Sequence, residues 1–479
     1  MNHRMITYLL GIMLLIEAAL MIFPLIVAIC YKESIVPFLL TMAIAVAVAI
    51  LPVIFKPKNR RIYAKDGFIT VAVGWILLSA IGALPFVFSG AIPNYVDALF
   101  ESVSGFTTTG ATVMTQIEGS GFGILFWRSF THWIGGMGVL VFMLAILPSA
   151  GGQAIHLMRA EVPGPTKEKL VPKMKNTAVI LYCIYIALTL LMIIALKICG
   201  LSVYDSIVSS LATAGTGGFS VLNDSIAGYN NPAAEWVIAI FMFLFGVNFN
   251  LYFYILIGKL KYIFKNEELR VYTAICAIST ALITVNTLKY FDGVGDAIRS
   301  AFFQVTTIIS TTGYATQNFD LWPEFSKTIL VMLMFIGACA GSTAGGLKVS
   351  RVVILFKSAI CEIMHMMRPG SVNVVRLDKE PVDRATVKKA GTHLVIYAFI
   401  AVFSILLISV DGFSLTTNAT AVISCINNIG PGLEVVGPVG NFAGYSMFSK
   451  LVLSANMLIG RLELMPMMVL IASVFSKKR

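Results

Sequence analysis

The sequence predicts an all-α integral membrane protein in which four similar units surround a common axis, preceded by two extra transmembrane helices. Three observations support this fold class. Of the 479 residues, 58% are hydrophobic and only 12% are charged, whereas soluble domains carry about 25% charged residues. The apolar residues form runs of about 20, the length that crosses a bilayer as a helix. A pair of such runs around a short polar stretch occurs four times in succession.

The first two apolar runs, about 5–30 and 36–55, form the predicted N-terminal transmembrane hairpin of residues 1–65. The first run is too long for the apolar part of a signal peptide and no small-residue cleavage pattern follows it, so we expect it to be retained. The seven cysteines of the chain are scattered, mostly within apolar runs. We interpret them as packing residues, not as disulfides or metal ligands.

The four units are pore repeat 1 (66–175), pore repeat 2 (176–268), pore repeat 3 (269–389) and pore repeat 4 (390–479). Each contains a long apolar helix, a short half-polar helix, a stretch rich in Gly and Thr, and a second long apolar helix. The predicted long helices are 68–87 and 122–147, 177–199 and 236–260, 271–290 and 325–356, and 394–410 and 448–475. With the N-terminal hairpin they make ten spans, an even number that places both termini on one side.

The polar stretches of the four units align on one glycine each. The aligned residues are Gly110, Gly218, Gly313 and Gly430, which are 108, 95 and 117 positions apart. Thirteen positions before three of these glycines stand Asp97, Asp205 and Thr417, and seventeen before the remaining one stands Asp296. Asp and Thr are good helix N-caps. We therefore predict a short capped helix before each polar stretch, one turn longer in the third unit. A second role for the three aspartates, and for Glu434, is to attract cations at the outer mouth.

The basic residues are distributed unevenly. Of the 35 Lys and Arg residues, 27 lie at Arg4 and in the segments 56–65, 159–175, 259–270, 348–389 and 477–479. These segments alternate with nearly uncharged connections, which is the positive-inside pattern of membrane proteins. We therefore expect both termini in the cytoplasm. The net charge of +11 reflects orientation in the bilayer, and we expect membrane lipid, not nucleic acid, to surround the protein.

Non-helical backbone at membrane depth occurs only where it is buried in protein or lines a water-filled cavity. Four such stretches most economically surround one axis, a central ion pore, and the C-terminal ends of the short helices would point about half a negative charge each toward it. Neutral carbonyls and hydroxyls at the narrow point suit a monovalent cation, whereas divalent cations prefer carboxylates. The candidate ligands are Thr108, Thr109, Gly110, Thr216, Gly217, Gly218, Thr311, Thr312, Gly313, Asn428, Ile429 and Gly430.

Two further features point to function. A glycine-rich run, 337–346, interrupts the 32-residue apolar segment 325–356. Close packing of small residues is one interpretation, but four glycines, two adjacent hydroxyls and the length favour a broken helix. Arg461 lies within an apolar run, where a charge costs about 2.5–3.5 kcal/mol at the bilayer centre. It either reaches into the ion path or pairs with a carboxylate, for which Glu463, on another helix face, is a poor candidate.

Arg128 and His132 fall near the start of the second long helix of the first unit. We favour a packing and hydrogen-bonding role for them over a proton relay. The chain has no HExxH motif, no nucleophile elbow and no aspartyl-phosphate motif, so we expect no catalytic or cofactor-binding residues and no enzymatic activity.

Four repeats with single glycines, the segment GACAGSTAGGLKVSR at 337–351 and the segment GRLELMP at 460–466 together resemble the Trk/Ktr/HKT superfamily of potassium translocation proteins. The extra N-terminal hairpin resembles the TrkH-type members, since Ktr-type members lack it. The resemblance implies M1–pore helix–M2 repeats with K⁺ bound in a filter. Superfamily members with serine at the first filter position are sodium-permeable, and all four positions here are glycine. It also implies an intramembrane gate and a pore-obstructing arginine, which would be Gly337, Gly341, Ser342, Thr343, Gly345, Gly346 and Arg461.

The same resemblance implies a homodimer in the bacterial inner membrane and a cytosolic ring of nucleotide-binding, TrkA-like regulatory subunits. Two transport modes stay open at this point: channel-like potassium uptake, and symport of K⁺ with H⁺ or Na⁺. A membrane scaffold without transport activity would not need four polar interruptions around one axis.

Overall fold

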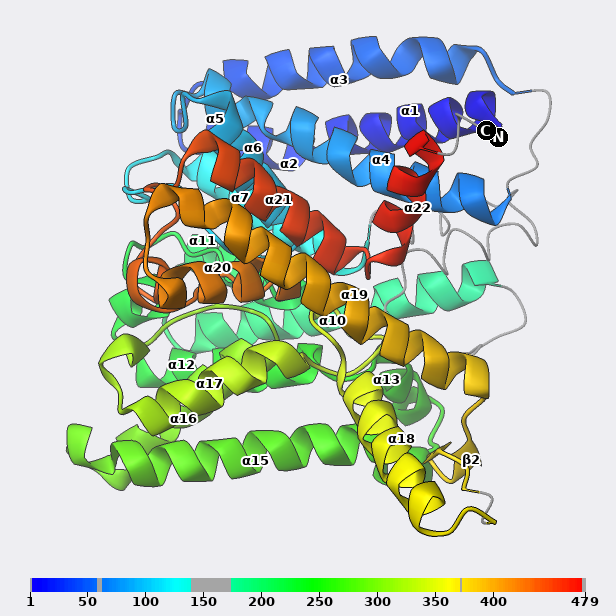
Figure 1. The fold of residues 1–479 in the computed structure, drawn as a ribbon. Helices are drawn as coiled ribbons and strands as arrows, with labels where there is room; N and C mark the ends of the chain where they lie inside the picture. The colour runs from blue at the N-terminus through cyan, green and yellow to red at the C-terminus, as the bar shows by residue number, and fades with distance from the viewer. Residues whose placement is uncertain (1, 58–62, 139–173, 371–372, 476–479) are drawn as a thin grey trace.

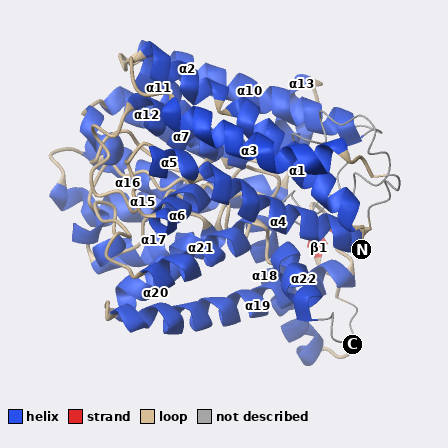
Figure 2. Cartoon of the chain, turned by 90° about the horizontal axis from the view of Figure 1, so that it is seen from above, coloured by secondary structure: helices blue, strands red, loops and turns tan. Residues whose placement is uncertain are grey.

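The computed structural model describes residues 2–57, 63–138, 174–370 and 373–475 (Figure 1). Most residues in this part of the chain are helical, and most loops gather at the end opposite the one short strand pair (Figure 2). The strands β1 (Arg376–Leu377) and β2 (Glu380–Pro381) form an antiparallel pair in which Arg376 is opposite Pro381. The predicted all-α membrane fold is therefore confirmed.

The N-terminal hairpin forms as the apolar runs predict. Helices α1 (His3–Leu20) and α2 (Ile22–Cys30) together make one apolar segment of 28 residues, and α3 (Val36–Ile54) packs against α1. In Figure 1 this hairpin lies along one flank of the molecule, beside α4 (Ala64–Gly82) of the first repeat. Helix α1 contacts α4 directly, so the hairpin is part of the same body as the repeats.

The four repeats follow in the predicted order. The first contains α4, α5 (Leu84–Phe88), α6 (Tyr95–Phe106) and α7 (Phe122–Gly136). The second contains α10 (Met174–Ile198), α11 (Val203–Gly215), η2 (Ser225–Tyr229), α12 (Pro232–Phe245), α13 (Phe249–Leu256) and α14 (Lys261–Lys265). The third contains α15 (Glu267–Thr287), η3 (Leu288–Tyr290), α16 (Val294–Ile309), η4 (Phe319–Leu321), α17 (Glu324–Ile336) and α18 (Val349–Met367). The fourth contains α19 (Arg384–Ile408), η5 (Ser409–Asp411), α20 (Leu415–Asn427), η6 (Glu434–Val436), α21 (Met447–Arg461) and α22 (Met465–Phe475).

The short helices α6, α11, α16 and α20 begin one turn earlier than the sequence predicts. Asn94 caps α6, Ser202 caps α11 and Ser414 caps α20, each accepting backbone N–H groups through its side chain. The predicted caps Asp97, Asp205 and Thr417 are instead the third residues of their helices, and Asp296 is likewise inside α16. Acidic side chains in a first turn are still favoured there by the helix dipole. Helix α16 has 16 residues against 12 or 13 in the others, which confirms the extra turn.

Three of the second long helices are interrupted. The sequence predicts a break only in the third repeat, where α17 ends at Ile336 and α18 begins at Val349. The segments 236–260 and 448–475, predicted as continuous helices, are bent by 92° between α12 and α13 and by 118° between α21 and α22. The first repeat's helix is described to Gly136, and the rest of the predicted range 122–147 lies outside the described residues. These interruptions place backbone carbonyls at the centre of the bundle.

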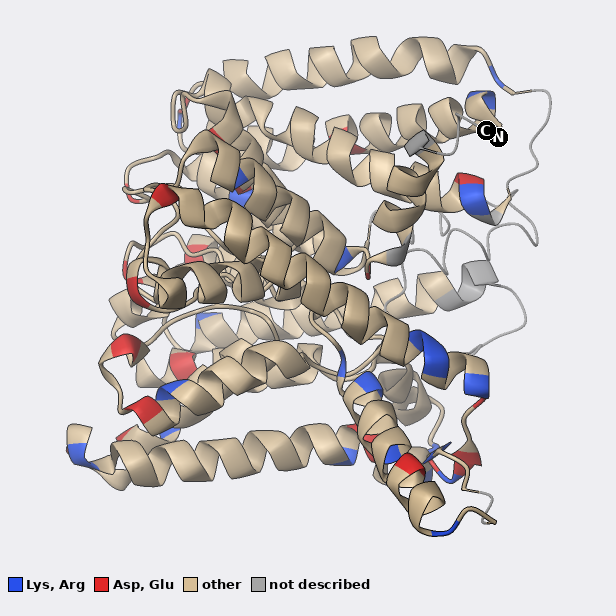
Figure 3. Ribbon diagram, in the orientation of Figure 1, with Lys and Arg blue, Asp and Glu red and all other residues tan. Residues whose placement is uncertain are grey.

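Six helical segments in the described part of the chain are long and apolar enough to cross a membrane, and counting each bent pair as one span makes eight. The other two predicted spans contain α7 and α17, which have 15 and 13 residues in the structure. Lys and Arg residues gather at the end of the bundle where α1 begins, α18 ends and α19 begins, whereas many acidic residues lie at the opposite end (Figure 3). The asymmetry agrees with the predicted distribution of charge.

Candidate ion-binding site

The four polar stretches adopt the same backbone turn. Thr108, Thr216, Thr311 and Asn428 all have φ between 56° and 58°, the left-handed region that non-glycine residues rarely occupy. The next amide in each stretch donates a hydrogen bond to a carbonyl five residues earlier. These bonds run from Thr109 to Ser104 (2.8 Å), from Gly217 to Ala212 (2.9 Å), from Thr312 to Thr307 (2.8 Å) and from Ile429 to Ser424 (3.0 Å). The four stretches that align in sequence therefore also share one backbone conformation.

The four stretches form a closed ring through their glycines, which have φ values of 76° to 101°. A Cβ atom on each glycine would collide with a carbonyl of the next repeat. The distances from this Cβ to the carbonyl oxygen of the next repeat are as follows: from Gly110 to Gly217, 2.0 Å; from Gly218 to Thr312, 2.0 Å; from Gly313 to Ile429, 1.9 Å; and from Gly430 to Thr109, 2.8 Å. The repeats therefore meet in the order 1, 2, 3, 4 and back to 1. All four glycines also line a single cavity of about 190 Å³.

The side chains of the ring are mostly engaged with protein. The hydroxyl of Thr109 lies 2.8 Å from that of Thr107, and the hydroxyl of Thr312 lies 2.7 Å from that of Ser310. Thr216 donates its hydroxyl to the carbonyl of Gly215 at 2.6 Å. None of the twelve candidate ligands is acidic or basic. What the ring can offer to a bound ion is therefore chiefly neutral backbone carbonyls, whose partial negative charge suits a cation.

Gly217 stands where the other repeats have Thr109, Thr312 and Ile429, and His132 explains the difference. A Cβ on Gly217 would lie 2.2 Å from Cγ of the His132 imidazole. That ring bonds the carbonyl of Gly105 through Nδ1 at 2.8 Å and accepts the amide of Phe219 at Nε2 at 3.3 Å. Nδ1 thus joins α7 to α6 within the first repeat, and Nε2 joins the first repeat to the second. This arrangement favours the predicted packing and hydrogen-bonding role.

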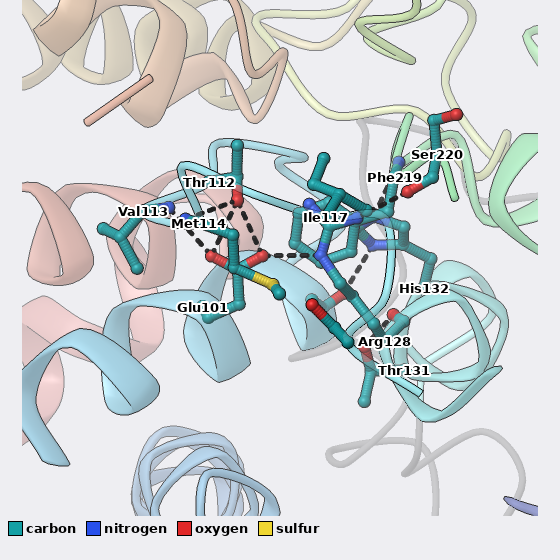
Figure 4. Close-up of polar contacts among 12 residues, drawn as sticks. Glu101, Thr112, Val113, Met114, Ile117, Arg128, Thr131, His132, Phe219 and Ser220 are labelled. Carbon is teal, nitrogen blue, oxygen red and sulfur yellow. Dashed lines mark hydrogen bonds and ion pairs between the residues drawn. The ribbon is translucent and has the colours of Figure 1, made fainter. Parts of the chain in front are cut away.

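A buried ion pair supports the same wall of the ring (Figure 4). Arg128 Nε donates to Glu101 Oε1 at 2.6 Å, and both side chains are at most 2% exposed. Arg128 also donates to the carbonyl of Ser220 at 2.8 Å and stacks on Phe219 with 3.6 Å between its Cζ and the ring centroid. Glu101 accepts in addition from the amide of Val113 at 2.9 Å. The pair joins α6, α7 and the polar stretch of the second repeat.

Glu101 is not among the residues predicted from the sequence. The signal was nevertheless present, because a carboxylate and a guanidinium in neighbouring membrane segments are expected to pair with each other. The spacing alone could not reveal it: the two residues are 27 positions apart, on different helices.

The glycine-rich run is a loop, as predicted, and it lies against the ring. Gly337, Gly341 and Gly346 have φ values of 69°, 71° and 74°. The amide of Gly345 donates to Thr311 Oγ1 at 2.7 Å. A Cβ on Gly345 would lie 2.5 Å from the carbonyl oxygen of Asn427. The alternative of a continuous helix packed through small residues is therefore wrong, since the chain leaves the helix here.

The hydroxyls of that loop face protein carbonyls. Ser342 donates to Cys339 at 2.6 Å and Thr343 donates to Phe245 at 3.3 Å. Glu268 of α15, which is 3% exposed, accepts the amides of Ala340 at 2.7 Å and Ser350 at 3.0 Å. One carboxylate therefore ties the loop to the first turn of α18.

Arg461 is the last residue of α21, so it stands at a helix break and not within a continuous span. Its guanidinium donates to the carbonyl of Thr343 at 2.8 Å, to that of Gly136 at 2.9 Å and to that of Gly135. Glu463 pairs instead with Arg351 of α18. Arg461 therefore connects the loop of the third repeat with the end of α7 in the first.

The acidic residues that the sequence predicts at the outer mouth have local partners. Asp97 pairs with Lys450 at 2.7 Å and Asp296 pairs with Arg299 at 2.7 Å. Asp205 Oδ2 accepts the hydroxyl of Ser202 at 2.6 Å, and Glu434 accepts that of Thr417 at 2.6 Å. Two of the four predicted cation attractors are thus neutralised by a basic neighbour.

The sequence and the fold are both similar to those of known proteins. Residues 34–478 match the family model TrkH, described as "Cation transport protein". The chain is 35% identical to "Trk system potassium uptake protein TrkH" of Salmonella typhimurium and 36% identical to that of Escherichia coli K12, in each case over 99% of both chains. Its fold superposes with a TM-score of 0.89 on the crystal structure of the potassium transporter TrkH from Vibrio parahaemolyticus, at 30% identity, covering 99% of this chain and 100% of that one.

Proposed function

This chain belongs to the TrkH family of cation transport proteins, and we propose that it is a channel-like potassium uptake protein whose selectivity filter is the ring of four glycine stretches. The observation that carries the proposal is the closure of that ring. Each filter glycine abuts a carbonyl of the next repeat, and all four glycines line one cavity. Relatives that are 35–36% identical are named for potassium uptake.

A monovalent cation such as potassium suits this ring better than a divalent cation does. Backbone carbonyls can replace the water shell of a monovalent cation, whereas Ca²⁺ and Mg²⁺ sites usually include carboxylates. The nearest carboxylate behind the first filter stretch, Glu101, is already paired with Arg128. Glycine at all four aligned positions lets the neighbouring carbonyls approach the axis. We therefore assign the K⁺ ligands to carbonyls of the segments 108–110, 216–218, 311–313 and 428–430.

We propose further that the loop between α17 and α18 is the gate and that Arg461 holds it closed. The loop bonds to Thr311 of the filter and packs against Asn427. The guanidinium of Arg461 is bonded to the loop, and a fixed positive charge beside an ion path repels cations. Opening would require these bonds to exchange for others as the loop moves.

Symport with H⁺ or Na⁺ is the alternative, and coupling to protons would require a group that titrates along the path. His132 has both ring nitrogens bonded to backbone, and Glu101 is held in an ion pair. These contacts favour the channel-like mode.

Uptake of rubidium into proteoliposomes tests the proposal. At a clamped membrane potential, a channel-like protein should accumulate Rb⁺ toward the concentration ratio that is in equilibrium with that potential, with or without a pH gradient. Uptake driven by the pH gradient or by a Na⁺ gradient at zero potential would indicate symport instead. Protein-free liposomes are the control, and no uptake above that control would overturn both transport modes.

A homodimer, a TrkA-like cytosolic ring and a bacterial inner-membrane location with cytoplasmic termini belong to the same proposal. The basic end of the bundle, which includes α18, β1, β2 and the start of α19, supports the assignment of the cytoplasmic side. Labelling of single cysteines at the two ends of the bundle in whole cells tests the orientation, and chemical cross-linking in the membrane tests the dimer.

A further inference from the structure

Glu17 of α1 is a buried carboxyl group in the N-terminal hairpin, away from the filter residues. Its side chain is 2% exposed. Within the described chain, neither of its carboxyl oxygens has a hydrogen-bond partner. An unpaired ionised carboxylate is far more costly to bury than a neutral acid. Whether Glu17 is ionised or neutral therefore depends on the polar and basic side chains of the helices that pack around it.

The carboxyl group lies where α1, α4 and α6 meet. Gly82 of α4 marks the contact, since a Cβ there would lie 3.1 Å from Glu17 Oε1, 3.0 Å from Ser102 Oγ and 2.6 Å from Cε2 of Phe106. Ser102 is fully buried, and its hydroxyl also lacks a partner among the described residues. The carbonyl of Gly82 accepts Nε1 of Trp127 at 3.0 Å, which holds this point of α4 against α7. A carboxyl and a hydroxyl, both unpaired, thus face the same small space.

No basic side chain on the packed helices is free to neutralise Glu17. Helices α2 and α3 carry no charged residue, and α1 itself carries His3 and Arg4 at its far end. The charged residues of α4, Lys65 and Asp66, are in its first turn, four turns from Gly82. On α6, Asp97 pairs with Lys450 and Glu101 pairs with Arg128.

We propose that Glu17 is a proton-binding site, a carboxylic acid that is neutral in the folded protein and lies beside the Ser102 hydroxyl. Ser102 and Phe106 belong to α6, which leads directly into the filter residues Thr108, Thr109 and Gly110. Loss of the proton would draw water or a counter-ion between α1 and α6, because a bare buried carboxylate is unfavourable. The extra hairpin therefore places a titratable group behind the first filter stretch.

Infrared difference spectroscopy of the reconstituted full chain tests the site without any measurement of transport. Wild-type protein at neutral pH should show the C=O stretch of a protonated carboxylic acid, and Glu17→Gln should abolish that band. Glu324→Gln removes a carboxylate that is 87% exposed and should leave the band unchanged. A wild-type spectrum without such a band would overturn the proposal.

Ser102→Ala provides a second measurement that does not depend on the folding of the Glu17 variant. It removes the hydroxyl that faces the carboxyl group and should shift the band in frequency. An unshifted band would assign the acid to another residue and contradict the proposal. Stabilisation of wild type by Na⁺, absent in Glu17→Gln and accompanied by no acid band, would show that a cation and not a proton neutralises Glu17. Failure of Rb⁺ uptake would affect only the proposed transport function, since neither spectrum depends on it.

Discussion

Arg461 and Thr343 are 118 positions apart, yet the guanidinium of Arg461 donates a 2.8 Å hydrogen bond to the carbonyl of Thr343. The bond ties the end of α21 in the fourth repeat to the loop of the third. Two further bonds from the same guanidinium reach Gly135 and Gly136 at the end of α7. One side chain thereby restrains the loop that lies against the filter, and its removal has a predictable effect.

Arg461→Ala should increase Rb⁺ uptake. A hydrogen bond to a charged group contributes about 1.5–3 kcal/mol, so loss of the bond to Thr343 should raise the population with a displaced loop roughly tenfold or more. Removal of the positive charge acts in the same direction. The measurement is uptake per assembled protein in proteoliposomes.

Arg351→Ala is the matched control, because Arg351 pairs with Glu463 and is not bonded to Thr343 in the structure. Its uptake should rise less than that of Arg461→Ala. Loss of assembled protein in Arg461→Ala, without a rise in uptake, would assign Arg461 a structural role instead.

Gly218→Ser should lower the selectivity for K⁺ over Na⁺. A Cβ at this position would lie 2.0 Å from the carbonyl oxygen of Thr312, so that carbonyl must move away from its place in the ring. The ratio of Rb⁺ to Na⁺ uptake under identical potentials is the measurement.

Gly200→Ser separates backbone strain from displacement of the carbonyl. Gly200 also has a positive φ, 94°, but nothing lies within 4 Å of a Cβ built on it. Its selectivity should match that of wild type. Unchanged selectivity in Gly218→Ser would mean that the second repeat does not contribute to the filter as aligned.

Glu101→Gln should destabilise the protein by about 3–5 kcal/mol, the range for removing one partner of a buried ion pair. The substitution keeps the shape of the side chain but leaves the buried guanidinium of Arg128 without its counter-charge. Unfolding in detergent, followed by tryptophan fluorescence, measures the change in stability.

The exposed pair of Glu324 with Lys327 offers the comparison for that result. Glu324 is 87% exposed, and surface pairs contribute about 0–1 kcal/mol. Glu324→Gln should therefore be nearly neutral. If Glu101→Gln lowered the free energy of unfolding no more than Glu324→Gln does, a stabilising role for the buried pair would be contradicted.

The backbone amides at the start of α20 should lose protection from hydrogen exchange at acidic pH. Hydroxyl hydrogen bonds from Ser414 and Thr417 lower the pKa of the exposed Glu434 carboxyl below its ordinary value of 4.5. A carboxyl group whose pKa is lower in the folded than in the unfolded protein stabilises the folded state at pH values above its unfolded-state pKa. This stabilisation is lost as the pH falls through the lowered, folded-state pKa. Hydrogen exchange in the first turn of α20, corrected for the intrinsic pH dependence, measures the effect.

Glu434→Gln should remove the acid-dependent part of that exchange, since glutamine does not titrate. Glu118→Gln is a suitable control because Glu118 accepts the amide of Asn223, in a different loop. If wild type and Glu434→Gln showed the same dependence on pH, another group would be responsible for it.

The sequence predicted the helices and turns that depend on neighbouring residues. It did not predict the exact helix starts or the bend between α12 and α13. The lengths of the apolar runs predicted α1 to α4, and the aligned glycines identified the four stretches that share one backbone turn in the structure. The caps were misplaced by one turn because Asn94 and Ser202 suit a cap as well as Asp97 and Asp205 do. The 92° bend after α12 was missed because Gly246, Asn248 and Asn250 are isolated among apolar residues and form no continuous polar run.

Composition and spacing along single segments were enough to predict the membrane class, the four repeats, the broken helix at 337–346 and the uneven distribution of charge. The packing of the helices was needed to see that the glycines meet in a closed ring, that Glu101 pairs with Arg128, that Arg461 bonds to Thr343 and that Glu17 has no hydrogen-bond partner among the described residues. The physical reason is that these contacts join segments on separate helices, and which side chains meet there depends on how the helices pack. Spacing along the chain does not contain that information.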